Sequence, residues 1–106
     1  MSLNDLTKEI HDANRYKGFW DDDNPNVTEK IMLVVSELAE AVEELRSDMS
    51  GYYEVDGKPE GVDVELVDAL IRLLDILGYR GADVEKILTA KLAYNATRPY
   101  KHGRMF

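Results

Sequence analysis

The chain has 106 residues, of which 44% are hydrophobic, and this is the composition of one folded domain rather than of a disordered segment. Its formal net charge of −8 argues against an extended nucleic-acid surface, because phosphate contacts need concentrated Lys and Arg. No cysteine is present, which excludes disulfide bonds and thiolate metal sites, and no apolar run is as long as a membrane span. We therefore expect a single cytoplasmic domain over residues 1–106, with neither a membrane nor a nucleic acid polymer as partner.

The first stretch with helical periodicity runs from about residue 3 to residue 16. Its apolar residues recur at i, i+3, i+7 and i+10, and Ser2 is a suitable N-cap. The polar segment KGFWDDDNPN that follows predicts a loop, because it combines a glycine and a proline with many Asp and Asn residues. Its aromatic residues, Phe19 and Trp20, allow two interpretations. They cover one end of the core, or one of them stacks on a flat ligand such as a nucleobase.

Three further helices are expected. The second covers about residues 28–47, and residues 48–61, with three glycines and a proline, predict a linker with a short strand or turn. The third, 62–77, is apolar nearly all the way round, which is typical of a helix buried in a bundle or an oligomer. The fourth covers about 83–94 and precedes a basic tail, 95–106. The chain therefore predicts an all-α fold, a compact four-helix protomer that assembles into a helical-bundle dimer or tetramer.

Two of these helices each carry a carboxylate pair at i, i+3. Glu37 and Glu40 lie on one face of the second helix, and Glu65 and Asp68 lie on one face of the third. If the helices pack side by side, all four side chains converge and repel one another, and a divalent cation relieves that repulsion. Oxygen-only ligation favours Mg²⁺ first, with Mn²⁺ as a substitute.

Two alternatives to a magnesium site compete for these acidic residues. A di-iron carboxylate bundle expects a His three residues after a Glu, and neither His11 nor His102 has that spacing. An ordinary solvated helix face is the plain alternative, with Asp68 and Arg72 as an i, i+4 ion pair. Two pairs, one of them on a helix with almost no polar face, favour a metal site. Asp75 continues the same line of polar residues, either supporting the site from behind or pairing with Arg72.

The assembled order of these residues resembles the MazG-like all-α nucleotide pyrophosphohydrolases. Their signature is ExxE on one helix, a spacer, and ExxD on the next, and here it stands as ELAE at 37–40 and ELVD at 65–68. The flanking segments VSELAEAVEELR and VELVDALIRLLDILG resemble the two central helices of that family. Near the C-terminus, Lys91, Asn95 and Arg98, with the sequence HGR, resemble its K-x-x-x-N motif and basic tail. The resemblance extends from about residue 17 to the end.

The resemblance implies a helical dimer or tetramer that hydrolyses the α–β phosphoanhydride of an NTP or dNTP, giving the monophosphate and pyrophosphate. It implies that the four carboxylates hold Mg²⁺ and that Lys91 and Asn95 contact the nucleotide. The residue inventory fits this reaction independently, since without Cys or an evident Ser–His pairing a covalent route has no support. Either Glu37 or Glu40 is then expected to accept the proton of the attacking water, and the sequence does not choose between them.

The one basic concentration of this acidic chain lies at its C-terminus. For Lys91 and Arg98, contact with phosphate and the ordinary preference of cations for a helix C-terminus remain equal alternatives. Lys101, His102 and Arg104 are assigned to solvent.

The other end of the chain supplies the expected base side of the pocket, through Asn14, Lys17 and Trp20. The rival to an enzyme is a catalytically silent helical oligomerisation module, whose acidic residues pair with basic residues of a second subunit. Such a module has no need for Glu65 and Asp68 among so many apolar positions.

Overall fold

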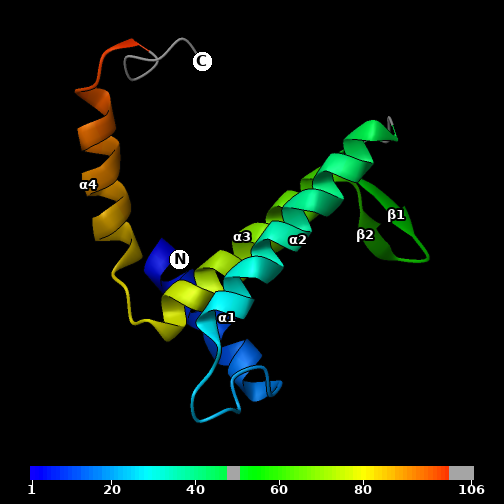
Figure 1. Cartoon of the computed structure of the whole chain (residues 1–106), viewed down its shortest axis with the longest axis horizontal. Coiled ribbons are helices and arrows are strands. Elements are labelled where there is room, and N and C mark those ends of the chain that lie inside the picture. Colours follow the sequence, from blue (N-terminus) through cyan, green and yellow to red (C-terminus); the bar gives the residue numbers. More distant parts are fainter. Residues whose placement is uncertain (48–50, 101–106) are drawn as a thin grey trace.

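The computed structural model describes residues 1–47 and 51–100, which form four helices and one β-hairpin. Helix α1 spans Leu3–Tyr16, α2 Val27–Arg46, α3 Val62–Tyr79 and α4 Val84–Ala96, and the strands β1 (Tyr53–Val55) and β2 (Lys58–Glu60) lie between α2 and α3 (Figure 1). The expected all-α, four-helix fold is confirmed, and every helix begins and ends within two residues of its expected position. The tail residues Lys101, His102 and Arg104 lie outside the described residues.

Three of the four helices begin at a side-chain cap that the sequence supplies. Ser2 and Asp5 form a reciprocal capping box at α1, and the side chains of Asn26 and Asp83 accept a backbone N–H in the first turn of α2 and α4. Each such cap stabilises its helix by about 1 kcal/mol, because it satisfies N–H groups that have no partner within the helix. Helix α3 begins instead at Gly61, whose φ of 120° favours glycine.

Helices α2 and α3 lie side by side along their length, in opposite directions, and the hairpin joins them at one end (Figure 1). The buried residues between them are small or branched: Val34, Ala69 and Ile76 form the core cluster. The hairpin turns through Asp56 and Gly57, both at positive φ, which is the two-residue turn that matches the twist of paired strands. This antiparallel pairing sets which faces of α2 and α3 meet.

The buried carboxylate of Asp75 on α3 fastens α1 and the following loop to the helix pair. It accepts hydrogen bonds from His11 Nδ1 at 2.8 Å, from Asn14 Nδ2 at 2.9 Å and from Trp20 Nε1 at 3.0 and 3.1 Å. The backbones approach closely here, since a Cβ on Gly78 would lie 2.7 Å from the Cβ of His11. The sequence allowed Asp75 either to support the acidic site or to pair with Arg72. The second alternative is wrong, because Arg72 pairs with Glu37 instead.

Helix α4 makes few contacts with the rest of the protomer. Asn4 joins it to the start of α1, donating to Asp83 at 2.9 Å and accepting from the backbone N–H of Glu85 at 3.0 Å. Beyond this junction α4, orange in Figure 1, stands away from α2 and α3.

Much apolar surface therefore stays exposed on the protomer. The accessible surface is 8177 Å², against about 6000 Å² expected for a folded monomer of 12.1 kDa. The exposed aliphatic side chains gather on three helices; among them are Ile31, Leu38, Val42 and Leu45 on α2, Leu66, Leu70 and Leu73 on α3, and Ile87, Leu88 and Leu92 on α4. None of the helices within residues 1–47 and 51–100 is long and apolar enough to cross a lipid bilayer.

The network around Asp75 predicts a large effect of its removal. Asp75→Ala leaves three donors without their acceptor, and we expect the free energy of unfolding to fall by about 3 kcal/mol in urea denaturation. Asp12→Ala, which removes only an exposed ion pair with Lys8, is the matched control and should change stability by less than about 0.5 kcal/mol. Equal effects of the two substitutions would contradict the role given to Asp75.

Candidate functional site

The antiparallel packing of α2 and α3 brings the four predicted carboxylates together. Carboxylate oxygens of Glu37, Glu65 and Asp68 lie within 4.8 Å of one another. Glu40 joins them through a hydrogen bond with Glu65, on the more exposed side. We call these four side chains the carboxylate cluster. Its geometry has the convergence expected from the two i, i+3 pairs, whereas its occupation by a metal ion stays a prediction.

Electrostatics within the carboxylate cluster are unfavourable for full ionisation. Glu65 is only 9% exposed, and burial, followed by hydrogen bonds with Glu40 and Glu37, raises the pKa of its carboxyl from 4.5 to about 7. Burial, and then the charge of Glu37, also raise the pKa of Asp68, against the opposing charge of Arg72. The cluster therefore retains a proton near neutral pH, and binding of a cation would release it.

Arg72 is a basic residue that forms an ion pair with the carboxylate cluster within the same protomer. Its Nε donates to Glu37 Oε1 at 2.9 Å, so the ion pair links α3 to α2. The i, i+4 partner that the sequence suggested, Asp68, feels the Arg72 charge through space only. The guanidinium side chain is 43% exposed, which leaves part of it accessible to a ligand.

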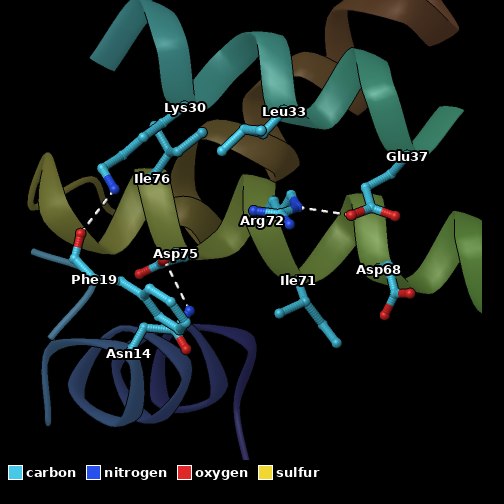
Figure 2. Close-up of a pocket in the computed structure, with 10 residues that line it drawn as sticks. All are labelled: Asn14, Phe19, Lys30, Leu33, Glu37, Asp68, Ile71, Arg72, Asp75 and Ile76. Carbon is cyan, nitrogen blue, oxygen red and sulfur yellow. Dashed lines mark hydrogen bonds and ion pairs between the residues drawn. The ribbon is translucent and has the colours of Figure 1, made fainter. Parts of the chain in front are cut away.

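A cavity of about 490 Å³ opens beside the carboxylate cluster, a size typical of small-molecule sites (Figure 2). Its polar lining falls into two groups along α3. Glu37, Asp68 and Arg72 lie together, and Asn14 and Asp75 lie farther toward the C-terminal end of α3 (Figure 2). Phe19 and Lys30 belong to the second group, and the aliphatic side chains of Leu33, Ile71 and Ile76 complete the walls.

The residues predicted for the base side have different environments. Asn14 lines the cavity, whereas Lys17 caps the C-terminus of α1 and does not belong to the lining. Trp20 is also absent from the lining: its ring stacks on Tyr79 with centroids 4.4 Å apart, and the ammonium of Lys30 lies 4.1 Å from its centroid. Phe19 is the aromatic residue of this loop that faces the cavity.

The residues predicted on and after α4 do not join the cavity within one protomer. Lys91 and Arg98 lie near the ring of Tyr94, at 5.2 and 5.9 Å from its centroid, and neither they nor Asn95 belong to the cavity lining. Because α4 stands away from α2 and α3, these side chains reach the carboxylate cluster only if another subunit supplies them (Figure 1).

Two basic residues of the cavity, Lys30 and Arg72, were not assigned to a ligand from the sequence. A signal for each was present. Lys30 precedes Glu37 by seven residues and Arg72 follows Asp68 by four, spacings that place both cations on the helix faces that carry the carboxylates.

Comparison with protein-family models, with curated proteins and with solved structures finds no match for this chain. The likeness to the MazG-like pyrophosphohydrolases therefore remains a resemblance carried by the motifs, and the case for the site depends on the side chains described above.

The raised pKa of Glu65 predicts a pH-dependent stability. Below pH 4.5 the folded and unfolded states both hold the proton; between 4.5 and about 7 only the folded state holds it, and stability falls as the pH rises. We expect Tm to decrease from about pH 5 to about pH 8 in metal-free buffer, and Glu65→Gln, which has no proton to lose, to flatten this decrease.

The matched control for this measurement is Glu9→Gln, a substitution of an exposed glutamate on α1, which should keep the wild-type pH dependence. An unchanged pH dependence in Glu65→Gln would show that the cluster does not hold this proton.

Proposed function

We propose that the protein is a Mg²⁺-dependent nucleotide pyrophosphohydrolase of the MazG-like kind, which converts an NTP or dNTP into its monophosphate and pyrophosphate. The observation that carries the proposal is that Glu37 and Asp68, two members of the carboxylate cluster, line one end of a cavity that also contains basic and aromatic side chains. A nucleoside triphosphate needs this combination, because its phosphates require positive charge and its base requires a flat apolar partner.

The carboxylate cluster fits a hard divalent cation. Its donors are all oxygens, three of them lie close enough to share one ion, and their mutual repulsion favours any cation that enters. Glu37, Glu65 and Asp68 would hold Mg²⁺, or Mn²⁺ in its place, with Glu40 beside them. When bound, the ion neutralises phosphate charge and lowers the pKa of a bound water.

The chain's own residues supply the remaining requirements. Glu37 or Glu40 accepts the proton of the water that attacks the α-phosphorus. Arg72 uses its Nε for Glu37, so its terminal nitrogens remain to hold phosphate oxygens. Lys30 lies at the other end of the cavity, where its ammonium donates to the Phe19 carbonyl.

Self-association completes the proposal. The protomer exposes about 2000 Å² more surface than a monomer of its size, or about 4000 Å² for two copies, which lies within the range that obligate dimer interfaces cover. A second copy packed on the apolar faces of α2, α3 and α4 would cover them and bring Lys91 and Asn95 of α4, with Arg98 just after it, to the cavity of its neighbour. We therefore propose a homodimer or homotetramer whose sites draw on two subunits.

The same exposed faces favour the second candidate, a catalytically silent oligomerisation module in which the carboxylate cluster has a structural role. The two candidates differ in turnover. They do not differ in assembly.

Product analysis with a panel of NTPs and dNTPs tests the reaction. With Mg²⁺ we expect monophosphate and pyrophosphate from some members of the panel, and with EDTA we expect none. Glu40→Gln and Asp68→Asn should reduce kcat at least about 100-fold while the protein stays folded, because they remove ionisable oxygens without changing side-chain size. Glu43→Gln, an exposed substitution on the same helix as Glu40, is the control and should keep full activity.

Full activity in Glu40→Gln or Asp68→Asn would refute the role given to that residue. No turnover of any nucleotide by a folded sample in millimolar Mg²⁺ would favour the oligomerisation module.

Light scattering tests the assembly. We expect a mass of two or four times 12.1 kDa, and we expect Leu70→Glu on α3 or Leu92→Glu on α4 to shift the protein toward monomer, because each places a charge on an apolar face. Lys8→Glu, on the exposed side of α1, should leave the mass unchanged. A monomeric wild-type protein at micromolar concentration would exclude a stable oligomer.

A further inference from the structure

The cavity beside the carboxylate cluster has a second, less charged end. Asp68 and Asp75 are seven residues apart on α3, which corresponds to about 10 Å along the helix axis. That separation is comparable to the distance between the phosphate and the base of one nucleotide. A nucleotide whose phosphates lie at the carboxylate cluster therefore places its base near Asn14, Phe19 and Asp75 (Figure 2).

Phe19 offers the flat surface at this end. The residue is 60% exposed although it lies in the cavity wall, and its backbone carbonyl accepts a hydrogen bond from Lys30 Nζ at 2.8 Å. The loop that carries this ring is thus held to α2. Stacking on an aromatic ring does not depend on the identity of the base, because every base has a π face. Selection among bases must come from a polar side chain.

Asp75 is not available for that selection. Its Oδ1 accepts from His11 and Trp20, and its Oδ2 accepts from Asn14 and Trp20. A carboxylate oxygen has two acceptor positions, and each oxygen of Asp75 has one donor of its own and shares the single N–H of Trp20 with the other oxygen. Asp75 can only position other groups.

Asn14 is the group so positioned. Because Asp75 only accepts, the amide of Asn14 must turn its Nδ2 toward the carboxylate, as Figure 2 shows, and its carbonyl Oδ1 is left over. This oxygen has no hydrogen-bond partner in residues 1–47 and 51–100. Since no side-chain nitrogen or oxygen buried in those residues lacks a partner, Oδ1 must be accessible. The base end of the cavity therefore presents a fixed, unpaired acceptor.

From this arrangement we infer that the site selects nucleotides whose base carries an exocyclic amino group, at C6 of a purine or C4 of a pyrimidine, and that Asn14 makes the selection. The inference rests on the proposed function. An amino group donates a hydrogen bond to Oδ1. An oxo group in the same place brings two acceptor oxygens together, so that the oxo oxygen and Oδ1 repel each other and neither receives a hydrogen bond from the other.

Two pairs of substrates contain this difference, together with the change of the neighbouring ring nitrogen (N1 of the purine, N3 of the pyrimidine) from an acceptor to an N–H donor. ATP and ITP differ at C6 of the purine, and CTP and UTP differ at C4 of the pyrimidine. We expect kcat/KM to be about tenfold higher for the amino member of each pair, the effect of one hydrogen bond gained and one repulsion avoided. In Asn14→Leu both ratios should fall to within about twofold of unity. A ratio measured within one variant does not depend on how much of the sample is folded.

Two control variants separate selection from general damage. Asn24→Leu, in the exposed loop before α2, should keep both ratios. Phe19→Ala should raise KM for all four nucleotides and leave the ratios unchanged, because it removes stacking without touching the amide.

Binding of AMP and IMP by titration calorimetry measures the same preference without turnover. Preference for AMP that disappears in Asn14→Leu would support the inference even if no triphosphate is hydrolysed, and would then refute the proposed reaction alone. Equal or better use of ITP, UTP and IMP by the wild type would overturn the inference, as would an amino preference that survives Asn14→Leu.

Discussion

The hydrogen bonds to the buried carboxylate of Asp75 are the constraint on which the rest of the structure depends. They come from α1 and from the loop after it, two segments far from α3 in the sequence. Without that acceptor, the side chains of His11, Asn14 and Trp20 would lose their hydrogen bonds to α3. The same bonds decide which loop side chain faces the cavity, because they turn the indole of Trp20 against Tyr79 and leave Phe19 outward. A contact that stabilises the fold thereby shapes one wall of the candidate site.

Helix α3 treats its acidic residues in two opposite ways. Asp75 is surrounded by donors, whereas Glu65 and Asp68, farther toward the N-terminus of the helix, face other carboxylates and have raised pKa values through burial and that proximity. The first arrangement is stable as it stands. The second holds electrostatic repulsion that a proton relieves in part and that a divalent cation would relieve further. This contrast distinguishes a structural acid from a candidate ligand on a single helix.

The helices followed from the sequence because their apolar periodicities and caps are local signals, as Ser2, Asn26 and Asp83 illustrate. The convergence of the carboxylates followed because two i, i+3 pairs on helices joined by a short linker have few other ways to pack. The partner of Arg72, and the choice between Phe19 and Trp20, did not follow, because both depend on contacts between segments far apart in the chain. The sequence also did not predict how α4 packs. A helix with apolar residues on several sides does not indicate whether its own chain or another chain covers them.

The β-hairpin between α2 and α3 bears on how much the chain length can vary without loss of the carboxylate cluster. Its tip, Asp56 and Gly57, is exposed and lies at the far end of the connection, while Asp63 N donates to Gly51 O at 2.9 Å and closes the base of the connection next to α3. Residues added at the tip would lengthen the strands and leave the ends of α2 and α3 in place. The number of residues between ExxE and ExxD is therefore a weak criterion for recognising this kind of site, and the antiparallel pairing of the two helices is the stronger one.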